Sequence, residues 1–355
     1  MAADLCGVLG IDLPIVLGPF GGLSSVELVA AVSDAGGLGS YGLYGYDHGR
    51  ILEVGGALRA ATARPFALNI WLPLPDEQDP DPSVVRRAAE ALRPLYADVG
   101  LDVPADLPAT YLPAVGEQWE AVLTVAPAAV STVYGVPSAT MLRQAHDRGI
   151  AVLGTATTVA EAIVLAEAGV DAVVATGFEA AGHRVSFLRR PEESLVGTFA
   201  LVPQVVDAVD VPVIAAGGVA DRRGVAAAFA LGADGVQVGT AFLRTRQSAA
   251  TDAHRDAIAR VSADGTVLTR AMSGRLARGV PNRAVATIEE GGVIAPFPAQ
   301  NWLTGRFRAE AGRRGIGELA SLWAGQSSPL ATRREAGEVF AELATGIPSA
   351  GTDRP

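Results

Sequence analysis

Short apolar runs rich in Val, Ile and Ala alternate with segments of helical pattern, and this alternation constrains the fold more than any other feature of the sequence. Eight of these runs are expected to be strands: residues 14–18, 38–42, 65–71, 129–134, 151–154, 172–175, 211–216 and 235–239. Strands that alternate with helices pair in parallel, and a parallel sheet is buried on both faces. Eight such units predict an α/β fold of the closed (β/α)8, or TIM, barrel type.

The helical segments carry recognisable start and stop signals. Residues 158–168 place apolar side chains at helical spacing and are followed by Gly169, the usual residue just past a helix C-terminus. Ser24 precedes Glu27 by three residues, which matches a capping box. The pattern therefore predicts Ser24 as the N-cap of the first barrel helix, and residues 36–37, both glycine, as its end.

Two stretches interrupt the strand–helix repeat. Residues 74–114 are rich in Pro and Asp and are too long for a simple connection between a strand and its helix. They follow the third expected strand, at the end where barrels carry their working loops. Residues 246–345 follow the last strand and are expected to form helices and loops that cap the barrel mouth. We therefore divide the chain into a barrel at 1–245, a capping segment at 246–345 and a frayed tail at 346–355.

Charge and cysteine content limit the partners and the compartment. The formal charge is −10 and the pI about 5.0, which gives no basic surface for nucleic acid. The single cysteine, Cys6, excludes an internal disulfide and favours a reducing compartment. No secretory signal pattern begins the sequence, and no apolar run reaches the roughly 20 residues that span a bilayer. We expect a cytoplasmic protein that acts on a small molecule, without nucleic acid or membrane partners; the oligomeric state stays open, a homodimer included.

Glycine pairs follow the last two expected strands. Gly217 and Gly218 end the seventh strand. Gly239 and Thr240 end the eighth, and barrel enzymes often bind phosphate with these two loops. Glycine lets backbone N–H groups approach phosphate oxygens, although it can also simply ease the turn after a strand. The G-x-G-x-x-G stretch at residues 37–42 does not fit a dinucleotide fingerprint, because a helix precedes it and a strand overlaps it.

Two amide side chains lie in strands that are otherwise apolar. Asn69 belongs to the third expected strand and Gln237 to the eighth. A buried amide without a partner costs roughly 1–3 kcal/mol, so each side chain must be satisfied. Each can bond to a neighbouring strand, or it can point into the barrel mouth toward a ligand.

His183 is one of four histidines in the chain and lies after the sixth expected strand, at the same barrel end as the glycine turns. The small residues at 180–182 permit close approach of a ligand, and histidine is the usual residue for proton transfer near neutral pH. Arg184 beside it could favour an anion, whereas a structural histidine at the surface is the alternative. The remaining histidines are His48, His146 and His254. Their spacing gives no metal-ligand pattern, so no metal is expected.

Taken in order, these residues resemble the nitronate monooxygenase family, formerly called 2-nitropropane dioxygenases, which are FMN-dependent barrel enzymes. The resemblance covers most of the chain. Its most specific blocks are residues 177–184, Gly-Phe-Glu-Ala-Ala-Gly-His-Arg, and residues 237–240, Gln-Val-Gly-Thr. The other matching segments are residues 14–22, 35–39, 154–158, 216–218 and 273–279, together with Asn69.

The resemblance implies an FMN over the barrel mouth. The residues implied to bind it are Phe20, Gly21, Gly22, Asn69, Thr176, Ala181, Gly182, Gly217, Gly218, Gln237, Val238, Gly239 and Thr240. The phosphate would rest on Gly218, Gly239 and Thr240. His183 matches the family's active-site histidine, which orients an anionic nitronate or takes a proton from the nitroalkane. The implied reaction is oxidation of an alkyl nitronate by O2 to a carbonyl compound and nitrite.

The sequence departs from the family at three positions in these blocks. Thr176 stands where the family usually has a Gln that bonds to the flavin, Phe20 where it often has Met, and Ala181 where it usually has Gly. A similar barrel with similar glycines occurs in FMN-dependent enoyl-thioester reductases that use NAD(P)H, and the block at 177–184 does not separate the two classes. A flavin-binding carrier without chemistry is a third alternative.

Overall fold

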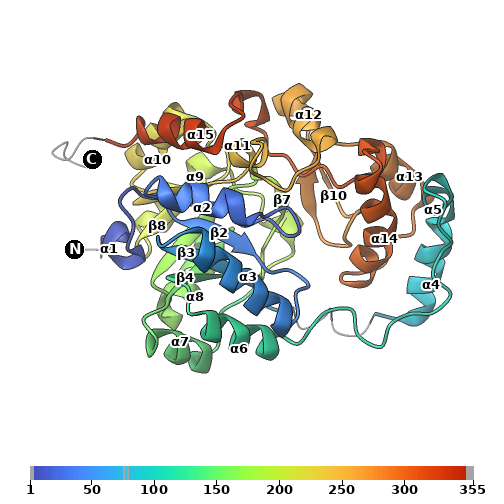
Figure 1. The fold of residues 1–355 in the computed structure, drawn as a ribbon, viewed down its shortest axis with the longest axis horizontal. Coiled ribbons are helices and arrows are strands. Elements are labelled where there is room, and N and C mark those ends of the chain that lie inside the picture. The colour runs from blue at the N-terminus through green and yellow to red at the C-terminus, as the bar shows by residue number, and fades with distance from the viewer. Residues whose placement is uncertain (1–3, 75–76, 78–79, 349–355) are drawn as a thin grey trace.

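The computed structural model of this protein describes residues 4–74, 77 and 80–348. Eight parallel strands form a barrel (Figure 1). They are β1 (Ile15–Leu17), β2 (Gly39–Gly42), β3 (Phe66–Trp71), β4 (Ala129–Val133), β5 (Ala151–Ala156), β6 (Ala172–Thr176), β8 (Val213–Ala216) and β9 (Gly235–Val238), paired in the order β1-β9-β8-β6-β5-β4-β3-β2. Backbone bonds from Leu17 N to Leu38 O, 2.9 Å, and from Leu38 N to Ile15 O, 3.0 Å, close the ring. The predicted (β/α)8 barrel is confirmed.

A ring of helices covers the outside of the barrel. It consists of α2 (Val26–Asp34), α3 (His48–Ala61), α6 (Val115–Val125), α7 (Ala139–His146), α8 (Val159–Ala168), α9 (Thr198–Val206), α10 (Arg222–Ala230) and α15 (Ala336–Ala344). As predicted, α8 ends directly before Gly169 and α2 shortly before Gly36. Helix α15 packs between α2 and α10, and its Phe340 lies so close over Gly37 that a Cβ there would be 2.6 Å from the ring. The last helix of the expected cap therefore completes the barrel wall.

The start of α2 differs from the prediction. Its N-cap is Ser25, whose hydroxyl accepts from Leu28 N at 3.0 Å, so the assignment of Ser24 was wrong. The hydroxyl of Ser24 donates to Phe20 O at 2.9 Å and accepts from Gly42 N at 3.1 Å. Ser24 thus ties the turn after β1 to the end of β2, a long-range contact that a local capping pattern does not encode.

The insertion and the C-terminal extension meet beside the barrel (Figure 1). The insertion forms α4 (Pro82–Ala91) and α5 (Arg93–Asp98), and the extension forms α12 (Asp252–Arg260), α13 (Arg283–Gly291) and α14 (Ala299–Arg313). A second hydrophobic cluster joins them through Val85, Leu92, Leu95, Tyr96, Val285, Ile288, Leu303 and Phe307. The hydroxyl of Tyr96 also donates to Leu303 O at 2.6 Å. The extension is therefore held by residues that precede the fourth barrel strand.

A small antiparallel sheet links the extension to the loop after β6. It has the order β10 (Val267–Thr269), β11 (Ala277–Gly279) and β7 (Gly182–His183). Ala277 pairs with His183, and Arg184 N donates to Leu276 O at 2.8 Å. The segment expected to be a plain loop is therefore partly a strand, which fixes the backbone of His183.

The remaining short helices close the ends of the barrel and its connections. They are α1 (Leu5–Leu9), α11 (Thr240–Leu243) and the 3₁₀ turns Pro191–Glu193, Ala263–Gly265, Gly317–Leu319 and Ser328–Leu330. Leu5 and Leu9 of α1 are buried against small strand residues such as Ala129 and Ala172, at the end of the barrel opposite the glycine turns. Of the tail expected at 346–355, residues 349–355 lie outside the described residues. Within the described part of the chain, no helix has the length and apolarity needed to cross a bilayer.

Candidate active site

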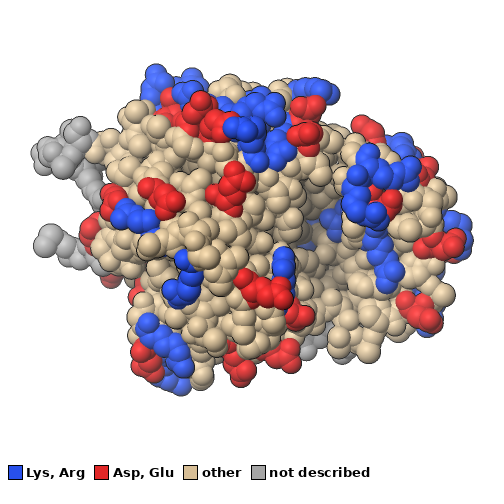
Figure 2. All heavy atoms as spheres, viewed as in Figure 1, with Lys and Arg blue, Asp and Glu red and all other residues tan. Residues whose placement is uncertain are grey.

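A cavity of about 600 Å³ lies at the carboxyl ends of the barrel strands, between the barrel and the extension. Figure 2 shows a hollow in this face, with the barrel on one side and the helices of the extension on the other. The predicted cofactor residues that line the cavity are Phe20, Gly21, Gly22, Asn69, Thr176, Ala181, Gly182, Gly217, Gly218, Gln237, Gly239 and Thr240. Val238 does not, because neighbouring residues of a strand face opposite sides and its side chain is fully buried.

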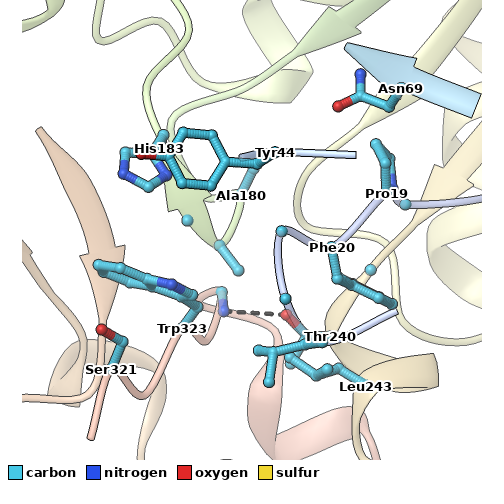
Figure 3. A pocket seen from close by; sticks show the side chains of 18 of the residues that line it. Pro19, Phe20, Tyr44, Asn69, Ala180, His183, Thr240, Leu243, Ser321 and Trp323 are labelled. Atoms are coloured by element: carbon cyan, nitrogen blue, oxygen red, sulfur yellow. Dashed lines mark hydrogen bonds between the residues drawn. The ribbon is translucent and has the colours of Figure 1, made fainter. Parts of the chain in front are cut away.

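The turns after β8 and β9 form an open cradle of backbone N–H groups. Gly217 and Gly218 have φ of 93° and 77°, a left-handed backbone that glycine adopts without strain. Among the described residues, no protein acceptor is recorded for the N–H groups of Gly218 or Gly239. The hydroxyl of Thr240 accepts from Gly325 N at 3.1 Å, which leaves its own proton free to donate (Figure 3). This donor set suits a phosphate.

Both strand amides face the cavity. Asn69 Nδ2 donates to Ser131 Oγ at 2.9 Å, which leaves the amide oxygen as an acceptor turned toward the cavity (Figure 3). Gln237 also lines the cavity, and no hydrogen bond of its side chain is recorded within the described residues. Asn69 therefore bonds to a neighbouring strand and also faces a ligand, which are the two alternatives left open by the sequence. Gln237 offers both the oxygen and the nitrogen of its amide to a ligand.

His183 is enclosed on three sides. The centre of its ring lies 5.0 Å from the ring centre of Trp71, edge to face, and 5.3 Å from that of Trp323. Its Nε2 is 2.8 Å from Ser273 Oγ. Figure 3 shows the imidazole above the indole of Trp323. His183 lines the cavity, so the alternative of a surface histidine does not apply.

The surroundings of His183 keep its imidazole neutral. Burial lowers its pKa to about 3, and the positive charges of Arg275 and Arg308 act in the same direction. A neutral imidazole at pH 7 can donate or accept a hydrogen bond. Its low pKa makes it a weak base toward a carbon acid, in contrast to the proton transfer near neutral pH that its residue type suggests.

Arg308 lines the cavity from α14 and lacks a counter-charge. Its terminal nitrogens donate to Asn301 Oδ1 and to Ser321 Oγ, both at 2.6 Å, and Asn301 Nδ2 donates to Tyr44 Oη at 2.8 Å. Nε has no partner, and no ion pair of Arg308 exists within the described residues. Burial lowers the pKa of Arg308 to about 10, so it remains charged at pH 7. A largely enclosed cation without a counter-charge is unfavourable, and an anionic ligand would supply that charge.

Arg275 is charged and buried too, but its charge is already balanced. Its Nε is 2.6 Å from Glu77 Oε1, and its guanidinium lies 3.5 Å from the centre of the Tyr134 ring and 3.8 Å from that of Phe297. Stacking of this kind stabilises a guanidinium between aromatic faces. Arg275 therefore forms part of the wall behind the cavity.

Arg184 does not have the role that its place in the sequence suggested. Its side chain is 2% exposed and turns inward, where it donates to Gly177 O at 2.7 Å and to Thr176 O at 3.2 Å. It holds the end of β6 and does not line the cavity. The prediction that it favours an anion was wrong, because the guanidinium that faces the cavity is that of Arg308.

His254 supports one wall of the cavity. It is 2% exposed, and its Nε2 lies 2.8 Å from Trp323 O, so Nε2 carries the proton that this carbonyl accepts. Burial lowers its pKa to about 4. Within the described residues, no group of three or more His, Cys, Asp or Glu side chains is placed to hold a metal ion.

Several residues of the cavity were not predicted from the sequence. They are Tyr44, Trp71, Phe297, Asn301, Arg308 and Trp323. Trp71 could have been found, because it ends the third strand next but one to Asn69. The others reach the cavity through packing of the extension and of the β2 loop, which no local pattern describes.

The fold is that of a (β/α)8-barrel enzyme, and the cavity lies at the carboxyl ends of the strands, where enzymes of this fold carry their sites. The sequence model of one family, described as nitronate monooxygenase, matches residues 3–346. The chain therefore belongs to the nitronate monooxygenase family, a family of flavin-dependent oxidoreductases.

Individual relatives agree with this assignment. A probable nitronate monooxygenase of Staphylococcus aureus (strain MSSA476) is 37% identical over 345 residues, which cover 97% of this chain and 96% of the relative. The crystal structure of nitroalkane oxidase from Streptomyces ansochromogenes has a TM-score of 0.85 at 32% identity, covering 96% of this chain and 97% of that one. The structure of FabK from Thermotoga maritima has a TM-score of 0.74 at 28% identity, covering 97% and 95%.

Proposed function

We propose that this protein is an FMN-dependent enzyme that oxidises alkyl nitronates with O2 to carbonyl compounds and nitrite. The observation that carries the proposal is the guanidinium of Arg308, which faces the same cavity as His183 without a carboxylate partner. A nitronate is an anion, so it would supply the missing charge beside an imidazole that is neutral. The family and the similarity to a nitroalkane oxidase support the same chemistry.

The residues of the barrel mouth fit FMN. The N–H groups of Gly218 and Gly239 and the hydroxyl of Thr240 would hold the phosphate, because they are donors without an acceptor in the described protein. Asn69 and Gln237 would bond to the polar edge of the ring system. When bound, the flavin would accept electrons from the substrate and pass them to O2.

The side chains around His183 would position the substrate and exclude water. Trp71 and Trp323 pack on the imidazole and leave one ring nitrogen free for a ligand. Arg308 and Tyr44, linked through Asn301, would place the nitronate oxygens beside His183. Fixed donors in a partly enclosed cavity bind an anion without the reorganisation that water requires.

An anaerobic reduction experiment tests this proposal. The purified protein is loaded with FMN and mixed, without O2, with ethylnitronate or with NADPH, while the flavin absorbance is followed. We expect the nitronate to bleach the flavin and NADPH to leave it oxidised, and we expect nitrite to accumulate once O2 is admitted. Rapid bleaching by NADPH alone would instead favour an enoyl-thioester reductase. A protein that cannot be reconstituted with FMN would refute the flavin assignment.

A further inference from the structure

Ser273 is the only described side chain that hydrogen-bonds to His183. It lies between β10 and β11, is 1% exposed, and places its Oγ 2.8 Å from His183 Nε2. The pairing of Ala277 with His183 brings these two segments together, although they are far apart in the chain. The contact is therefore built by the small sheet and is not a chance approach of two mobile side chains.

The hydroxyl of Ser273 has one proton and two acceptors within reach. It accepts a hydrogen bond from Arg275 N at 3.3 Å, and it can donate either to His183 Nε2 at 2.8 Å or to Arg275 O at 3.2 Å. If it donates to Nε2, the neutral imidazole must carry its proton on Nδ1. If it donates to Arg275 O, Nε2 carries the proton and Nδ1 is a bare acceptor.

The charge of the expected ligand favours the first arrangement. The 2.8 Å contact with Ser273 engages Nε2 on the side of the buried protein, so Nδ1 is the ring nitrogen left for a ligand. Arg308 draws an anion to this side of the cavity, as described above. An anionic oxygen is stabilised by an N–H and repelled by a nitrogen lone pair.

We propose that Ser273 is a positioning residue that donates its proton to His183 Nε2 and so keeps the histidine proton on Nδ1, facing the substrate. His183 then offers a hydrogen-bond donor to an oxygen of a preformed nitronate anion. In this form Nδ1 has no lone pair with which to take a proton from a neutral nitroalkane. The identity of the anion rests on the proposed function, whereas the position of the proton rests on the contact with Ser273 and on an anion held by Arg308.

Nitrogen NMR measures the proton position directly. The sample is FMN-loaded protein labelled with ¹⁵N-histidine. The chain has four histidines, so the signals of His183 are assigned as those missing from a His183→Gln variant. We expect a protonated Nδ1 and an unprotonated Nε2 in the unmodified protein. Ser273→Ala should move proton density to Nε2, and Ser273→Thr, which keeps the hydroxyl, should restore the original pattern.

Ser33→Ala is the matched control for the loss of a buried hydroxyl. Ser33 is fully buried in α2, where its hydroxyl donates to Pro65 O at 2.8 Å and accepts from Gly39 N at 3.1 Å, outside the cavity. This variant should leave the signals of His183 unchanged. A protonated Nε2 in the unmodified protein, or His183 signals that do not respond to Ser273→Ala, would overturn the inference. The first of these outcomes can be read even if the Ser273 variants do not fold.

Steady-state kinetics connects the proton to the substrate. For Ser273→Ala we expect kcat/KM for ethylnitronate to fall about tenfold, the scale of one hydrogen bond to an anion, while kcat/KM for nitroethane does not fall. An equal loss for both substrates would contradict the inference. If neither compound is oxidised by any form of the protein but the NMR pattern follows Ser273, then the proposed function fails and the assignment of the proton stands.

Discussion

At the level of single residues, His183 and Arg308 differ in charge: one side chain is neutral and the other is positive. The imidazole stays neutral because it is buried between two tryptophans and lies near two guanidinium groups. Arg308 stays charged without a carboxylate beside it. In the proposed function, the pair would favour a ligand that is already anionic: Arg308 would recognise its charge and His183 would orient it.

Replacing His183 by Asn should remove turnover and keep the cofactor. We expect nitronate oxidation to fall roughly 10- to 100-fold, because the hydrogen bond from the ring to the anion, worth about 1.5–3 kcal/mol, is lost. Bound FMN, measured by absorbance after gel filtration, should be unchanged. His48→Asn, at an exposed position, is the control. Full activity of His183→Asn would contradict the assigned role.

Replacing Arg308 by Met should weaken substrate binding more than chemistry. Loss of a charged hydrogen bond to an anion costs about 1.5–3 kcal/mol, so KM for a nitronate should rise roughly 10- to 100-fold. Steady-state kinetics at constant ionic strength measures this change. Arg306→Met on the same helix, where the guanidinium is exposed and lies 4.4 Å from the centre of the Trp302 ring, should leave KM unaltered.

At the level of elements, the turns after β8 and β9 should bind the cofactor through backbone groups. Gly218 has φ of 77° with open space where a Cβ would lie, and Gly149 has φ of 68° with similar space but lies outside the cavity. An Ala at either position adds about 1 kcal/mol of backbone strain. Only Gly218→Ala should also fill the phosphate cradle, and we expect its affinity for FMN to fall about tenfold or more relative to Gly149→Ala. Equal FMN affinities, measured by fluorescence titration, would argue against the cradle.

Much of the barrel could be predicted from the sequence, because each strand and its helix are local features. All eight strands lie within two or three residues of their expected positions, and the glycine turns and His183 reach one cavity as expected. The failures have a common cause. Ser24 does not cap α2, because its hydroxyl joins the turn after β1 to the end of β2. Arg308 reaches the cavity only because α14 packs on the insertion. Such contacts join distant segments and leave no periodic trace.

For the whole molecule, buried neutral histidines should make stability depend on pH. The pKa of His254 is lowered to about 4 in the folded state, against about 6.5 when unfolded, so the unfolded chain binds more protons between these values. Its contribution is therefore intact above pH 6.5 and is lost as pH falls toward 4. At pH 5 we expect a cost of about 2 kcal/mol relative to pH 7.

Urea unfolding of the unmodified protein and of His254→Gln at both pH values measures this dependence. The glutamine amide can still donate to Trp323 O but does not titrate, so the variant should lose less stability on acidification. A drop of equal size in both proteins would show that His254 stays uncharged in the unfolded chain or gains its proton without unfolding, contrary to this prediction.

The second hydrophobic cluster has a consequence for how the molecule comes into being. A ribosome delivers α4 and α5 well before the helices against which they pack, and Ser273, Arg308 and Trp323 emerge only after the last barrel strand. Until those helices are made, the nascent chain therefore exposes the apolar faces of α4 and α5 that are later buried in the second hydrophobic cluster. The residues that enclose the cavity and α15, the last helix of the barrel wall, are all made in the final third of translation, so the nascent barrel stays open on both counts until the extension has been made.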